Sequence, residues 1–229
     1  MLKSFIIREF EATLNRFTQY NIIKSAFNSI QSSFEGLGIG YFCSAKKFSS
    51  ESEMEFWASI IRILGECSRI ISDETEYKGF PQRIYKYVRK CIEYHVTDNL
   101  PIDTNQTLIR DFLSRELLNQ NLISSNDNNV LTGSNLEFIK PSDKYWLCPR
   151  CFAVHLHKSA GICCACFHKG LLEKNFSDYK KKLESNYYLS QNELNSLHCE
   201  EMTGQTDKSL SPKRQRLFQD MPNPSSIAK

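Results

Sequence analysis

The sequence predicts a mainly α-helical protein with a small β component and a C-terminal four-cysteine zinc ribbon. Apolar residues recur at three- and four-residue steps over most of the first 118 positions, which is the period of amphipathic helices. Short apolar runs between Asn, Asp, Ser and Gly follow from 119 to 140, and this pattern favours short strands. Two C-x2-C pairs between 148 and 166 then indicate a metal-binding module.

The composition is that of a globular chain. Of its 229 residues, 41% are hydrophobic and 24% are charged, and no apolar run approaches the roughly 20 residues that span a bilayer. The N-terminal stretch MLKSFIIREFEATLNRF carries charges inside its apolar pattern, unlike a secretory signal. We therefore expect a cytoplasmic protein with no membrane partner, in a reducing compartment where clustered cysteines bind metal more often than they form disulfides.

Residues 1–100 are expected to form a helical domain. One or two helices fit residues 6–34, and EGLGIG at 35–40 then makes a turn; it is no phosphate loop, because no Gly-Lys-Ser/Thr follows. Ser50 and Glu53 form a capping box before a helix that runs from Met54 toward Ile71. A further helix is expected from about Pro81.

The remaining chain divides into four parts. Residues 101–140 read as a helix plus a β-hairpin, compatible with a winged helix and equally with a plain helical domain that ends in a hairpin. The zinc ribbon takes residues 141–172. A polar helix and a short further segment follow over 173–220, and residues 221–229 are expected to be a disordered tail.

The predicted metal ligands are Cys148, Cys151, Cys163 and Cys166. A C-x2-C turn lets two thiolates converge, and two such turns facing each other offer the tetrahedral sulfur set that suits Zn²⁺. Eleven residues separate the pairs, enough for one strand to run out and return through the turn at 159–161. Because four sulfurs leave no open position for water, the expected Zn²⁺ is structural rather than catalytic.

Other interpretations of this stretch remain open. Cys164, His155, His157 or His168 is a candidate to replace one of the four ligands. The CPRC sequence at 148–151 also resembles a thiol-redox motif, but such a motif opens a helix, whereas FAVHLH after it alternates like a strand.

The charge distribution suggests where nucleic acid would bind. Of the 29 basic and 26 acidic residues, 13 and 9 lie in residues 141–229, so the positive excess falls beside the cysteines. The first candidates for phosphate contacts are Lys158, Lys169, Arg214 and Arg216. A solvated helix face would give the same pattern.

Two motifs resemble those of a known family. They are WLCPRCFAVHLHKSAGICCACF and, some 30 residues later, LHCEEMTGQTDKSLSPKRQRLF. Together they resemble the region between the two RecA-like motor lobes, and the start of the second lobe, in large superfamily 2 DEAD/DEAH-box helicases of bacterial phage-defence islands. The specific resemblance covers about residues 145–220, and a looser one covers 50–140. It implies a parent protein that remodels DNA using ATP.

This chain has no ATP-binding motif of its own. It contains neither GxxxxGK[ST] nor an acidic Walker-B strand, so we expect no ATP hydrolysis by this chain alone. The leading hypothesis is a non-catalytic zinc-binding helicase fragment that contacts DNA, the remaining helicase lobes or other defence-system subunits. The alternatives are a zinc-stapled protein-interaction domain without a nucleic-acid role, and an enzyme, either a thiol oxidoreductase or a surviving ATPase.

Overall fold

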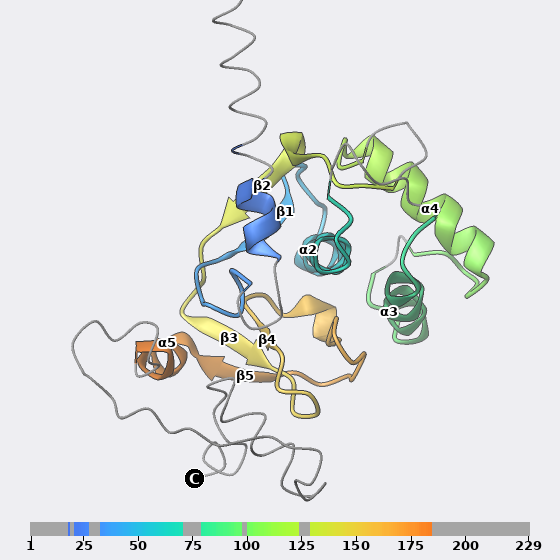
Figure 1. Ribbon diagram of the computed structural model, residues 1–229. Helices are drawn as coiled ribbons and strands as arrows, with labels where there is room; N and C mark the ends of the chain where they lie inside the picture. Colours follow the sequence, from blue (N-terminus) through green and yellow to red (C-terminus); the bar gives the residue numbers. More distant parts are fainter. Residues whose placement is uncertain are drawn as a thin grey trace, which may run out of the picture. The chain divides into compact units, whose positions relative to one another are not determined.

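The computed structural model describes residues 18, 21–27, 33–70, 79–97, 100–123 and 129–184. The chain divides after Ser177 into two units, and the second begins within the last helix. The elements in order are β1 (Tyr41–Ser44), α2 (Glu51–Glu66), α3 (Gln82–Glu93), α4 (Gln106–Asn119), the 3-10 turn η1 (Gly133–Asn135), β2 (Leu136–Ile139), β3 (Lys144–Leu147), β4 (Val154–His155), the 3-10 turn η2 (Ser159–Gly161), β5 (Leu172–Asn175) and α5 (Phe176–Glu184) (Figure 1).

These elements make a mixed α/β fold, which is a broader class than the mainly helical fold that the sequence predicts. The cysteine cluster lies at 148–166, and β5 and α5 follow it along the chain. Arg214 and Arg216, the LHCEEMTGQTD motif, the expected tail and most of the first predicted helix lie outside the described residues. Within the described ranges, no helix is both long and apolar enough to cross a membrane.

Helix α2 is the central element of the first unit. It begins where predicted, because the Ser50 hydroxyl accepts a hydrogen bond from the Glu53 amide at 3.2 Å. The Glu53 carboxylate reaches back to Ser49 rather than to Ser50. Every residue from Glu55 to Gly65 is buried, so the helix is covered on all sides. Its apolar side packs with α3 and α4 into one core.

The strand at 136–139 pairs differently from the expected hairpin. One antiparallel bridge, Ile123 to Leu131, follows α4, but β2 pairs with β1, almost 100 positions earlier in the chain. The reason is aromatic packing: the Phe138 ring lies 5.6 Å from the Phe42 ring. Gly40 permits this approach, since a Cβ there would lie 2.4 Å from the Phe138 ring.

A second sheet carries the cysteines. Its strand order is β4-β3-β5, with both pairings antiparallel. The β3–β4 connection holds the first C-x2-C pair. The second pair lies inside a loop of the same length, closed by the bridge between Ile162 and Lys169. Both pairs therefore sit at the tips of short antiparallel turns, which brings their sulfurs together.

Candidate metal centre

The two C-x2-C turns have the same backbone geometry. In each, the amide of the first cysteine donates to the carbonyl five residues later, and the amide four residues later donates back to that cysteine's carbonyl. These bonds are Cys148 to Ala153 (3.0 Å), Phe152 to Cys148 (2.9 Å), Cys163 to His168 (2.9 Å) and Phe167 to Cys163 (2.9 Å). The repetition shows two equivalent knuckles, each of which directs its pair of thiols to one side.

A phenylalanine follows the second cysteine of each knuckle, at a position that favours glycine. Phe152 has φ 60° and Phe167 has φ 62°, both in the left-handed region. For a residue with a Cβ this conformation costs about 1–2 kcal/mol. The backbone hydrogen bonds of the knuckle hold each phenylalanine in this conformation.

The four predicted ligands come together as a group that could hold a metal ion. The Sγ atoms of Cys148, Cys151, Cys163 and Cys166 all lie within 4.8 Å of one another. Two of the separations, Cys148 to Cys166 and Cys151 to Cys163, are 3.5 Å. A Zn²⁺ ion with Zn–S bonds of about 2.3 Å requires sulfurs about 3.8 Å apart, so the cage needs only a small adjustment.

The thiols share their protons unequally. The hydrogen bond from Cys163 lowers the pKa of Cys151 to about 5, and the same bond raises the pKa of Cys163. Cys151 is the exposed member of the cluster. By contrast, burial raises the pKa of Cys43 to about 11 and that of Cys91 to about 12, as befits small core residues outside the four-sulfur group.

Cys164, His155 and His157 lie outside the group of four, although His155 contacts one of its sulfurs. Cys164 points into the core, where burial raises its pKa to about 12, and its sulfur lies 3.8 Å from Nδ1 of His155. His157 accepts a hydrogen bond from the Ser159 amide and packs its ring 4.8 Å from that of Tyr41. His155 Nε2 lies 3.4 Å from Cys163 Sγ, a hydrogen-bonding distance from a ligand sulfur.

A buried polar stripe on α2 holds the segment between the knuckles. Glu55, Ser59, Arg62 and Glu66 follow at steps of four, three and four residues, so they share one helix face. The Glu55 carboxylate accepts from the amides of Lys158 and Ala160, each at 3.2 Å.

Ser59 and Tyr87 fasten the turn that follows. The Ser59 hydroxyl lies 2.7 Å from that of Ser159, and the Tyr87 hydroxyl donates to the Ser159 carbonyl at 3.2 Å. Two hydroxyl contacts from different helices thus fix the turn at 159–161 on the core. The knuckles are therefore attached to the helical part by directional bonds as well as apolar packing.

Arg62 is the hub of the buried charges. Its guanidinium contacts Glu35 at 2.6 Å and Glu66 at 2.7 Å, and it donates to the Val154 carbonyl at 2.9 Å. Burial opposes the charged form of Arg62, but neighbouring negative groups, Glu35 and Glu66 among them, hold its pKa well above the usual value.

The two carboxylates respond in opposite directions. Burial raises the pKa of Glu35 despite the charge of Arg62. For Glu66, the charges of Arg62 and Arg83 outweigh burial and lower the pKa. Arg83 bonds Glu66 at 2.5 Å and also donates to the Cys164 carbonyl at 2.9 Å, inside the second knuckle. Arg62 on α2 and Arg83 on α3 therefore donate to a backbone carbonyl beside the first knuckle and to one inside the second.

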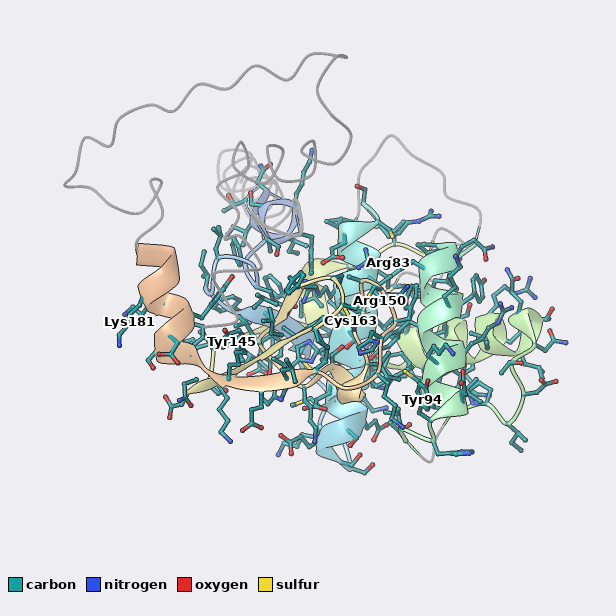
Figure 2. All side chains as sticks on the ribbon, turned by 90° about the horizontal axis from the view of Figure 1, so that it is seen from below. Arg83, Tyr94, Tyr145, Arg150, Cys163 and Lys181 are labelled. Carbon is teal, nitrogen blue, oxygen red and sulfur yellow. The ribbon has the colours of Figure 1, made fainter. Side chains whose placement is uncertain are left out.

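The described lysines among the candidate phosphate contacts lie in different surroundings. Lys158 is exposed at the start of the turn that Glu55 holds. Lys169 follows the second knuckle, with its Nζ 4.1 Å from the centroid of Tyr94 at the end of α3. Lys90 contacts the same ring at 5.6 Å. In Figure 2, Arg83 and Tyr94 mark the two ends of α3.

The sequence-based predictions did not include the polar stripe or its partners Glu35 and Arg83, and they marked His155 only as an alternative ligand. A signal was present: the spacing E-x3-S-x2-R-x3-E inside an otherwise apolar helix is unusual, because charged residues are seldom fully buried without a partner. Comparison of the chain with protein-family models, curated proteins and solved structures gives no match. Function is therefore inferred from the geometry of the site itself.

Proposed function

We propose that the chain is a non-catalytic zinc-binding segment of a DEAD/DEAH-box DNA helicase, acting in the cytoplasm beside the motor lobes or defence-system subunits. The observation that carries the zinc assignment is the convergence of four sulfurs within 4.8 Å. The helicase parent is supported by the two sequence motifs described above. In this function Cys148, Cys151, Cys163 and Cys166 would hold one Zn²⁺ as a structural ribbon.

The donor set favours a structural ion. Four thiolates complete a tetrahedral Zn²⁺ shell and leave no position for water or substrate. The small cluster of Cys148, Ala153 and Cys163 is far too little apolar surface to fold the knuckles alone. A bound metal would supply the missing energy, and the polar stripe on α2 would then fix the ribbon in place.

Metal content tests this assignment directly. Protein purified without chelators is expected to carry one Zn²⁺ per chain, measured by inductively coupled plasma mass spectrometry. Four solvent-shielded thiolates should release it only to a strong chelator or a thiol-modifying reagent. A fully folded, metal-free chain, or Cys148–Cys166 and Cys151–Cys163 disulfides found by mass spectrometry, would refute the structural zinc site.

A basic surface on α3 supports a role in nucleic-acid contact. Lys86, Lys90 and Tyr94 follow at four-residue steps along one face of α3, and Lys169 joins them from the second knuckle. Lys86 and Lys169 are exposed, so their charges can reach a phosphate backbone. Tyr94 gathers the charges of Lys90 and Lys169 around its ring, which concentrates the positive charge at this end of α3. The metal-held knuckle would thus complete the surface.

Reversing the two exposed charges tests this contact. The Lys86→Glu, Lys169→Glu double variant is expected to weaken binding to a 20-nucleotide single strand at least tenfold at 50 mM salt and to lower the salt slope by about 2, as measured by fluorescence anisotropy. Lys140→Glu, at the end of β2, is the matched control and should bind like the parent.

Equal binding by all three proteins, or binding that ignores salt, would leave protein–protein contact as the better function. The ribbon offers a surface for that alternative, because Phe152 and Leu172 are exposed at 37% and 49%. Replacing these two side chains by serine would then weaken capture of the partner while the lysine variants remained active.

A further inference from the structure

We propose that His155 is a positioning residue of the metal site, which donates its Nε2 hydrogen to the sulfur of Cys163 while Arg62 fixes its tautomer. The inference rests on the proposed four-cysteine metal site and adds a residue outside the ligand set. It also assigns a role to the buried charges on α2, which the ligand spacing leaves unexplained. Through His155, those charges would act on one sulfur of the cage.

The contacts of the two ring nitrogens determine the tautomer. His155 is fully buried on β4, with Nδ1 3.2 Å from Arg62 Nη1 and Nε2 3.4 Å from Cys163 Sγ. A guanidinium has only donors, so Nδ1 must be the acceptor in its pair. A neutral imidazole with an acceptor at Nδ1 carries its hydrogen on Nε2. That hydrogen faces the Cys163 sulfur.

Arg62 is held firmly enough to impose this choice. Glu35 and Glu66 bind its guanidinium at 2.6 and 2.7 Å, and the Val154 carbonyl accepts from Nη1 at 2.9 Å. The same Nη1 also makes the Glu35 contact, so its two hydrogens serve three acceptors, and one hydrogen is shared between neighbouring acceptors such as the Val154 carbonyl and His155 Nδ1. Two carboxylates, a guanidinium, an imidazole and a thiolate form one continuous chain from α2 to the metal cage.

The hydrogen bond has a clear chemical effect on a bound metal. A cage of four thiolates around Zn²⁺ carries a net charge of about −2, which is costly where Cys163 is buried. An N–H donor to one sulfur spreads that charge without adding a ligand. It also favours the deprotonated sulfur over the thiol, so the metal should bind more tightly and leave more slowly.

A pair of amide variants separates the two nitrogens. In His155→Gln, the amide nitrogen reaches the position of Nε2 and can still donate to Cys163. In His155→Asn, the shorter side chain reaches only the position of Nδ1, so it can face Arg62 but not the sulfur. His157→Asn is the matched control, because His157 is equally buried two residues along and bonds the Ser159 amide instead of a sulfur.

Zinc affinity is measured by chelator competition, and Co²⁺-loaded protein reports on the sulfurs through its thiolate-to-metal charge-transfer band. We expect His155→Asn to weaken Zn²⁺ binding about 10- to 100-fold and to shift the band to lower energy. His155→Gln should recover most of both changes, and His157→Asn should match the parent. Equal affinity and spectra for the Asn and Gln variants at position 155 would overturn the role of His155.

A measurement on the unaltered protein covers the case in which the variants do not fold. The ¹⁵N shifts of the His155 ring in zinc-loaded protein should show hydrogen on Nε2 and none on Nδ1. The opposite tautomer would overturn the inference while leaving the metal site intact. Failure of the parent to bind Zn²⁺ at all would instead remove the proposed site itself.

Discussion

Replacing Cys163 by serine is expected to abolish stoichiometric zinc and to unfold the ribbon. Cys163 is fully buried and contacts both Cys151 and His155, so a serine cannot reproduce its soft anionic sulfur. Structural zinc contributes on the order of 10 kcal/mol or more to such small modules. The zinc content should fall below about a tenth of the parent's, and thermal unfolding followed by circular dichroism should lose its cooperative transition.

Cys164→Ala is the matched control for this variant. Cys164 is adjacent and equally buried, but it lies outside the four-sulfur group. Its loss should cost only the packing of a small core residue, about 0.5–3 kcal/mol, and should leave one Zn²⁺ bound. If Cys164→Ala lost the metal while Cys163→Ser kept it, the ligand set would be wrong.

Removing the guanidinium of Arg62 should have the next largest effect. In Arg62→Met, Glu35 and Glu66 remain buried. Glu66 keeps Arg83, but Glu35 loses its only described cationic partner. Breaking a buried ion pair from one side typically costs about 3–5 kcal/mol, because the remaining charge stays desolvated. The free energy of unfolding of the zinc-loaded protein, measured with urea at pH 7, should fall by that amount.

An exposed ion pair provides the comparison. Lys90 bonds Glu93 at 2.6 Å on the surface of α3, and both side chains reach solvent. Water screens such a pair, so Lys90→Met should leave the urea midpoint unchanged within error. A small loss for Arg62→Met, similar to that of Lys90→Met, would mean that the buried charges contribute little to stability. Zinc content measured on both variants shows whether any loss acts through the metal.

Local sequence patterns predicted much of the candidate metal site. The C-x2-C spacing alone identifies the four sulfurs that converge, because a tight turn fixes two thiols without reference to the rest of the chain. The Ser50 cap was also predictable, since it depends on a few neighbouring residues. The helix expected from about Pro81 and the one expected within residues 101–140 are present as α3 and α4.

Long-range pairing was not predictable in the same way. Nothing near Phe138 indicates that it will pack against Phe42 rather than fold back on the Ile123 segment. The role of Arg62 depends on Glu35 and His155, which lie 27 and 93 residues away. A charged residue in an apolar helix shows that a partner must exist, but only the tertiary fold identifies it.

The long reach of these contacts has a consequence for the order of folding. The knuckles close a loop of 18 residues between Cys148 and Cys166, whereas the contact between Glu55 and Ala160 closes one of 105. Closing the longer loop costs about 1.5 kcal/mol more chain entropy. Metal capture should therefore come first during synthesis, and the Glu55 carboxylate on α2 gains its two amide partners only when the ribbon reaches it. A chain cut before β3 would lack the element that completes its own interior.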